Sequence, residues 1–131
     1  MQHPKLEEWD RVLKEIFDEI DRYLEDTYGS LYIRHPSRPK RGKTANPESD
    51  GLFNVGAAFS AGYGSEHGRG YVVEVDMVTL EEVDKEKQKT IEKDVAEKLR
   101  QKLKGRYPDK NLHVERDGPA FKIYGDFDIG K

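Results

Sequence analysis

The chain has 131 residues, of which 37% are charged and none is cysteine, and its formal net charge is −3 at pH 7. This length suits one domain, and the lack of cysteine excludes disulfide frameworks, thiolate metal sites and cysteine nucleophiles. No apolar run reaches the roughly 20 residues that a membrane-spanning helix needs. We therefore expect a single soluble domain, residues 1–131, in the cytoplasm. Its high charge content is also typical of thermophilic proteins.

A regular apolar stripe near the amino terminus predicts a long amphipathic helix from Pro4 to about Thr27. Apolar residues recur there every three or four positions, which places them on one side of a helix. The stripe consists of Leu6, Trp9, Leu13, Ile16, Phe17, Ile20 and Leu24. We expect it to pack against a sheet.

The next stretch is predicted to be a long basic loop at about 34–50, preceded by a short strand near 31–33. Residues before proline disfavour helix, and the loop contains three such pairs. No acidic residue lies between Thr27 and Pro47, and the cations there are Arg34, Arg38, Lys40, Arg41 and Lys43. A loop of this length in a small domain is usually functional or disordered, and its cations could otherwise pair with the domain's own acids.

Residues 52–78 predict a β-hairpin around a glycine-rich turn at 62–70. Alternate residues in each arm are apolar, which gives each arm one face for the core. On the other face the first arm has small residues, whereas the second has Glu74 and Asp76. If the arms pair directly across the turn, these acids lie opposite small residues and line a shallow acidic depression.

The second half of the chain repeats the order of helix and hairpin. A helix is predicted from Asp84 to Lys104, and the dipeptide Asp117-Gly118 favours a tight turn between two short strands. The predicted fold class is α+β: two amphipathic helices pack on one face of a mainly antiparallel sheet built from two β-hairpins, in the order α-β-β-α-β-β. A parallel pairing of strands through the second helix is the alternative.

The leading functional hypothesis is a non-catalytic binding domain for an anionic ligand or partner, such as a nucleic acid, with no cofactor. Guanidinium groups, ammonium groups and the backbone N–H groups of glycine-rich turns all bind anions. The predicted ligand-binding residues are Arg34, Arg38, Lys40, Arg41, Lys43, His67 and Arg69. An alternative is a structural or protein-interaction domain. The strand edges and the apolar helix also suggest a homodimer.

A second alternative rests on Asp50 before the first arm and on Glu74 and Asp76 in the second. Three carboxylates that converge can hold Mg²⁺. This order of acids resembles that of restriction-endonuclease-like nucleases over roughly residues 6–116, although Asp76 stands where that family has lysine. The resemblance implies a divergent metal-dependent nuclease, in which Asp50, Glu74 and Asp76 are the catalytic and metal-binding residues and Mg²⁺ is the cofactor.

Overall fold

The order of helices and strands along the chain confirms the predicted α-β-β-α-β-β arrangement. The structure is a computed structural model that describes residues 4–45, 50–60, 69–118 and 120–125. Its elements are α1 (Pro4–Tyr28), β1 (Phe53–Ser60), β2 (Gly70–Met77), α2 (Lys85–Arg106), β3 (Leu112–Asp117) and β4 (Ala120–Gly125).

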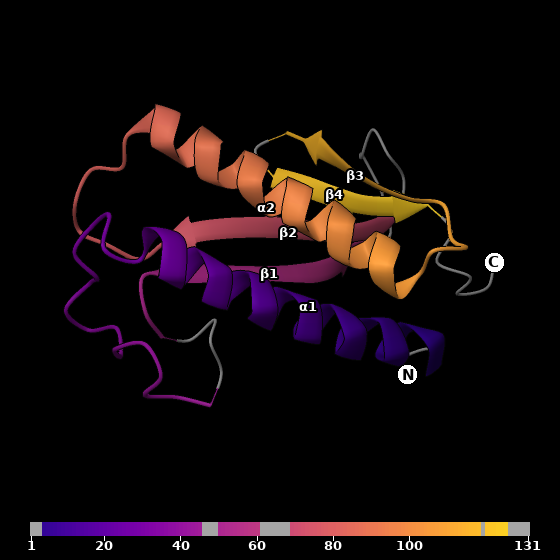
Figure 1. The fold of residues 1–131 in the computed structure, drawn as a ribbon, viewed down its shortest axis with the longest axis horizontal. Coiled ribbons are helices and arrows are strands. Elements are labelled where there is room, and N and C mark those ends of the chain that lie inside the picture. The colour runs from indigo at the N-terminus through magenta and orange to yellow at the C-terminus, as the bar shows by residue number, and fades with distance from the viewer. Residues whose placement is uncertain (1–3, 46–49, 61–68, 119, 126–131) are drawn as a thin grey trace.

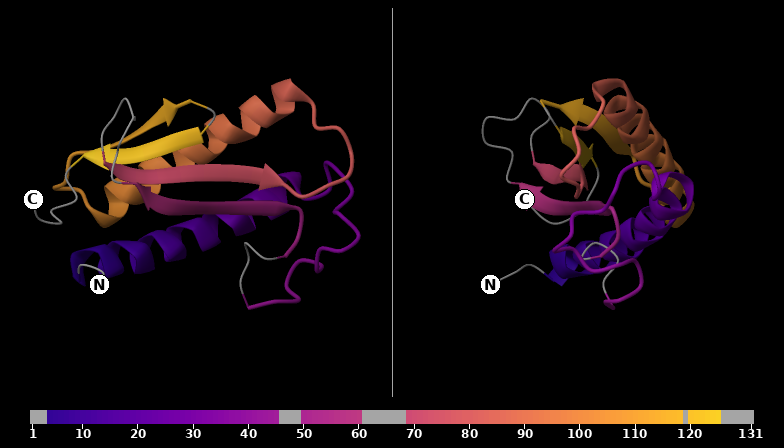
Figure 2. Two further views of the ribbon diagram at one scale, coloured as in Figure 1. Left: turned by 180° about the vertical axis from the view of Figure 1, so that it is seen from behind. Right: turned by 90° about the vertical axis from the view of Figure 1, so that its left-hand side faces the viewer.

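The strands form one four-stranded sheet in the order β1-β2-β4-β3, and both helices lie on the same side of it (Figure 1, Figure 2). All three strand pairings are antiparallel, so the parallel alternative is wrong. In the first hairpin Phe53 lies opposite Met77 and Ser60 opposite Gly70, which is the direct pairing that the acidic depression requires. The fold class is therefore α+β, as predicted.

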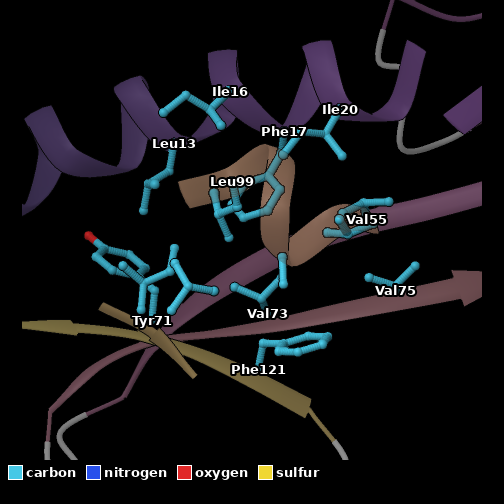
Figure 3. Close-up of a cluster of buried hydrophobic side chains, with 14 of the residues drawn as sticks. Leu13, Ile16, Phe17, Ile20, Val55, Tyr71, Val73, Val75, Leu99 and Phe121 are labelled. Carbon is cyan, nitrogen blue, oxygen red and sulfur yellow. The ribbon is translucent and has the colours of Figure 1, made fainter. Parts of the chain in front are cut away.

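The core lies between the sheet and the two helices, and it is built from the apolar faces that the sequence pattern indicates (Figure 3). The predicted stripe of α1 is buried from Trp9 to Leu24, and Val73 of β2 and Leu99 of α2 are fully buried. Each fully buried aliphatic or aromatic side chain contributes about 1.5–3 kcal/mol to folding. This core fixes α1 over the sheet and thereby fixes the polar residues that α1 carries.

The two helices are joined by a polar contact in addition to the apolar core. The Asp94 carboxylate of α2 accepts hydrogen bonds from the Tyr23 hydroxyl at 2.6 Å and from the Tyr28 hydroxyl at 2.9 Å. Burial, together with this carboxylate, raises the pKa of Tyr28 to about 12. The Lys98 ammonium also lies 4.5 Å from the centre of the Tyr23 ring. Asp94 thus helps to hold α2 to α1.

The segment between α1 and β1 contains no strand at 31–33, contrary to the prediction. A single antiparallel bridge joins Arg34 to Thr79, and the His35 N–H donates to the Val78 carbonyl at 2.8 Å. Pro36 follows at once and lacks the N–H that a longer ladder requires. In the described part of the chain, no helix is long and apolar enough to cross a membrane.

Candidate functional site

Glu25, near the end of α1, holds the start of β1. Its carboxylate accepts hydrogen bonds from the backbone N–H of Leu52 at 3.2 Å and of Phe53 at 2.9 Å. Gly51 has a φ of 71°, and a Cβ at this position would collide with the Glu25 carboxylate. The chain therefore needs glycine at residue 51 both for its backbone conformation and for the close approach of Glu25.

Arg38 of the basic loop holds the same stretch of chain from the other side. Its guanidinium donates to the backbone carbonyls of Asp50 at 3.1 Å, Gly51 at 3.1 Å and Phe53 at 2.9 Å. Arg34 in turn donates to the Arg38 carbonyl. These two predicted anion-binding residues therefore shape the loop from within. Arg38 and Glu25 together form a clamp on the first residue of β1, which we call the Glu25–Arg38 clamp.

Asp50 closes the far end of the basic loop. Its side chain is buried, and its Oδ2 atom accepts hydrogen bonds from the Thr44 N–H at 3.1 Å and from the Thr44 hydroxyl at 2.8 Å. Both donors satisfy the same oxygen of this buried side chain. Asp50 therefore brings a second buried carboxylate next to α1.

Asp21, one turn before Glu25, is a buried acid with a different environment. It is 1% exposed, and its Oδ2 atom has no hydrogen-bond partner among the described residues. Burial, followed by the charges of Glu25 and Asp50, raises the pKa of Asp21 to about 8, with Arg38 acting in the opposite direction. Leaving a buried polar group unsatisfied typically costs about 1–3 kcal/mol. Such an atom needs an explanation, and a ligand would supply the missing partner.

A cavity of about 250 Å³ lies beside Asp21, between α1 and the basic loop. We call it the loop pocket, and its lining residues are Asp21, Arg22, Arg41, Gly42, Thr44, Ala45 and Asp50. The two acids are buried, whereas Arg22 and Arg41 are exposed. Arg41 pairs with Asp26 of α1 at 2.6 Å, which ties the loop to the helix. The loop pocket therefore has an acidic, buried floor and a cationic, exposed rim.

The other predicted anion-binding residues are divided between the two ends of the first hairpin. Lys40 and Lys43 are exposed in the basic loop, near the start of β1. Arg69 directly precedes β2, whose first residue lies opposite the last residue of β1. Eight strand residues span about 26 Å, so Arg69 lies far from the loop pocket. His67 and the turn residues 61–68 lie outside the described residues.

The three acids of the nuclease alternative do not converge. Glu74 and Asp76 are exposed on the sheet face away from the helices, and they line a hollow of about 310 Å³ opposite Gly56 and Asn54. The predicted acidic depression is thus confirmed, but Asp50 is buried and turned towards Thr44. Among the described residues, no group of three His, Cys, Asp or Glu side chains could hold a metal ion. The proposed shared Mg²⁺ site therefore lacks geometric support.

The sequence prediction missed Asp21 and Glu25, although their spacing gives a signal. They continue, at four-residue intervals, the row of Leu13 and Phe17 on α1. Residues four apart lie above one another on a helix, so these two acids extend the buried face. Acids in line with an apolar row are rarely buried without a partner, and this pattern could have identified them.

Comparison with known proteins gives a family but no structural precedent. No solved structure shows a significant match to the chain. An uncharacterised protein of Borreliella burgdorferi (strain ATCC 35210 / DSM 4680 / CIP 102532 / B31) is 43% identical over 127 residues, which cover 97% of this chain and 99% of that protein. The matched region includes the helices, the basic loop and both hairpins. The chain belongs to a family described as "Uncharacterised protein", whose pattern matches residues 4–125.

Proposed function

We propose that this protein is a non-catalytic binding domain for an anionic ligand and that the ligand occupies the loop pocket. The observation that carries the proposal is the buried Asp21 Oδ2 atom, which has no partner in the described structure and belongs to a residue that lines the loop pocket. Destabilising groups of this kind are typical of functional sites.

The charge around the loop pocket favours an anion. Arg22 and Arg41 stand at its rim, and Lys40 and Lys43 are exposed in the same loop. Glu25 and Asp50 already accept hydrogen bonds from backbone N–H groups or from Thr44, and Arg38 lies beside them. Arg22 and Arg41 are exposed at the rim, where their charge can attract a ligand, and Arg41 also pairs with Asp26. Arg34 and Arg38, by contrast, keep the loop in shape.

The structural or protein-interaction alternative rests on a different surface. β1 is an edge strand without a charged side chain, and Ala57, Ala58 and Phe59 are exposed on it. Uncharged edges favour pairing with another chain, so a homodimer stays a prediction. Sedimentation equilibrium tests it: a species of twice 15.1 kDa at micromolar concentration supports it, and a single 15.1 kDa species contradicts it.

Ligand binding is tested by calorimetry and thermal shift at low salt, with sulfate, phosphate, nucleotides and short nucleic acids as probes. We expect at least one probe to bind and to raise the melting temperature, because a ligand that binds only the folded state stabilises it. The logarithm of the binding constant should fall with the logarithm of the salt concentration, and the slope should grow with the number of phosphate charges that the protein neutralises. A steep slope would therefore point to a nucleic acid. If none of the probes binds at low salt, the proposal is wrong.

A pair of matched variants locates the site. Arg22→Gln with Arg41→Gln removes two cations from the pocket rim, and we expect binding to weaken at least about tenfold. Lys89→Gln with Lys93→Gln makes the same charge change on exposed residues of α2 that do not line the pocket, and binding should stay near that of the wild type. Equal losses in both variants would indicate nonspecific attraction to the whole protein.

A further inference from the structure

The loop pocket carries a more specific inference, which rests on the proposed function. We infer that the ligand presents a small oxyanion, such as a sulfate, phosphate or carboxylate group, and that the Asp21 carboxyl group donates a hydrogen bond to one of its oxygens. In this arrangement Asp21 acts as a neutral donor on the floor of the pocket, while Arg22 and Arg41 supply positive charge at the rim.

The geometry around Asp21 explains why it would hold a proton. The side chain is 1% exposed and lies near two other buried acids, Glu25 and Asp50. Both of these accept hydrogen bonds from the protein. Asp21 has no such donor at Oδ2, and its burial beside two other acids disfavours its charged form. The raised pKa of Asp21, about 8, agrees with this assignment.

The charged groups that face Asp21 come from two parts of the chain. Asp18 and Glu25 lie on the same helix, and Asp50 and Arg38 face Asp21 from the basic loop. A neutral carboxyl group can donate through its O–H, whereas a carboxylate can only accept. An oxyanion that binds at Asp21 therefore receives a hydrogen bond from the protonated form and is repelled by the ionised form.

A cationic ligand is the competing chemistry, and it has less support. A divalent metal would need several ligands, and the described residues offer no group of three that could hold one. An ammonium group would favour ionised Asp21, but it would enter past Arg22 and Arg41, which repel it. The two chemistries differ in the sign of their pH dependence, because raising the pH weakens the binding of an oxyanion and strengthens the binding of a cation.

Sulfate is the best first probe, because it stays a dianion throughout the range from pH 6 to pH 9. We expect its dissociation constant for the wild-type protein to rise about tenfold between pH 6 and pH 9, as the fraction of protein with protonated Asp21 falls. Asp21→Asn keeps a donor that does not titrate, so its affinity should stay constant over this range. Asp21→Ala should lose binding at both pH values. The affinities for acetate and for a nucleoside monophosphate then show whether the oxyanion of the ligand is a carboxylate or a phosphate group.

The outcomes separate this inference from the proposed function. Sulfate binding that depends on Arg22 and Arg41 but does not change between pH 6 and pH 9 would keep the proposed function and overturn the role of Asp21. Affinity that rises with pH would also overturn it. If no anionic probe binds at either pH, the proposed function itself fails. The melting temperature of each Asp21 variant shows that it is folded before binding is measured.

Discussion

The acids on the two sides of α1 differ in how many hydrogen-bond donors they have. On the side that faces α2, Asp94 has two tyrosine hydroxyl donors, at 2.6 Å and 2.9 Å. On the side that faces the basic loop, Glu25 has two backbone donors, whereas Asp21, one turn away, leaves Oδ2 without a partner among the described residues. Asp94 and Glu25 can thus be explained by folding alone. Asp21 cannot, and this difference separates the acid that we assign to binding from the acids that hold the structure together.

The strongest test of this comparison is Glu25→Ala. The change leaves the N–H groups of Leu52 and Phe53 without their acceptor in a buried place, so we expect a loss of about 3 kcal/mol in the free energy of unfolding. Urea denaturation measures it. The control Glu19→Ala removes an exposed acid of the same helix that pairs with Lys102, and it should cost at most about 0.5 kcal/mol. If the two losses were equal, Glu25 would not be a structural clamp.

Gly51→Ala tests the same clamp from the backbone side. The new Cβ would collide with the Glu25 carboxylate, and the residue would also have to adopt a positive φ, so we expect a loss of about 2–3 kcal/mol. Gly42→Ala is a matched control, because Gly42 has a φ of 84° but has no atom within 4 Å of a new Cβ. It should cost only about 1 kcal/mol. Thermal denaturation of both variants separates the steric cost from the conformational cost.

Asp21→Asn should have the opposite effect and stabilise the protein. The pKa of Asp21 is raised from 3.8 to about 8 in the folded state, so the folded protein binds this proton more tightly than the unfolded chain does. The stability linked to this proton is fully present below about pH 4 and is lost as the pH rises to about 8. We therefore expect Asn to gain about 2 kcal/mol at pH 8 and much less at pH 4.5.

Melting curves of the wild type and Asp21→Asn at these two pH values check the sign. The exposed acid Asp109 serves as the control site, and Asp109→Asn should leave the melting temperature nearly unchanged at both. A destabilised Asp21→Asn variant at pH 8 would mean that the Asp21 carboxylate has a structural partner.

Asp94→Asn tests the other side of α1, where we expect the smallest effect. The amide can still accept a hydrogen bond, but it lacks the charge that strengthens both tyrosine contacts, so the loss should be about 1 kcal/mol. The carboxylate also contributes to the raised pKa of Tyr28, which should fall towards 10 in the variant. Ultraviolet titration of tyrosine measures this shift, and an unchanged titration would show that burial alone is responsible.

The elements of this fold follow from patterns that act over short distances. The stripe from Trp9 to Leu24 and the alternation in β1 and β2 predict the helix and the hairpin, because burial of one face determines each of them. The pattern leaves the register of the hairpin open by one or two positions. The loop pocket depends instead on how a long, irregular segment folds back on α1. No local periodicity shows that Arg38 turns inwards to three carbonyl groups while Arg22 and Arg41 stay at the rim.

The charge pattern of the sequence identifies the basic loop but not its geometry. No acid lies between Thr27 and Pro47, and the loop pocket lies beside this segment. The sequence suggests a different partnership for Asp50, with Glu74 and Asp76, because Asp50 stands just before the first arm of the hairpin. The direction of the Asp50 side chain is determined by its hydrogen bonds to Thr44, which sequence spacing does not reveal.

The Glu25–Arg38 clamp also has a consequence for the kinetics of local opening. The Arg38 half of the clamp joins the basic loop to the start of β1 through polar contacts, whereas Leu52 and Phe53 are also buried in the apolar core. Regions with few buried apolar contacts open more readily than the core does, so the basic loop can detach while the helices and the sheet stay folded. Native-state hydrogen exchange should then show the amide of Thr44, which donates to Asp50, exchanging faster than the amide of Val73 in the central strand β2. The rate at which the basic loop opens would then limit how fast a ligand can enter the loop pocket.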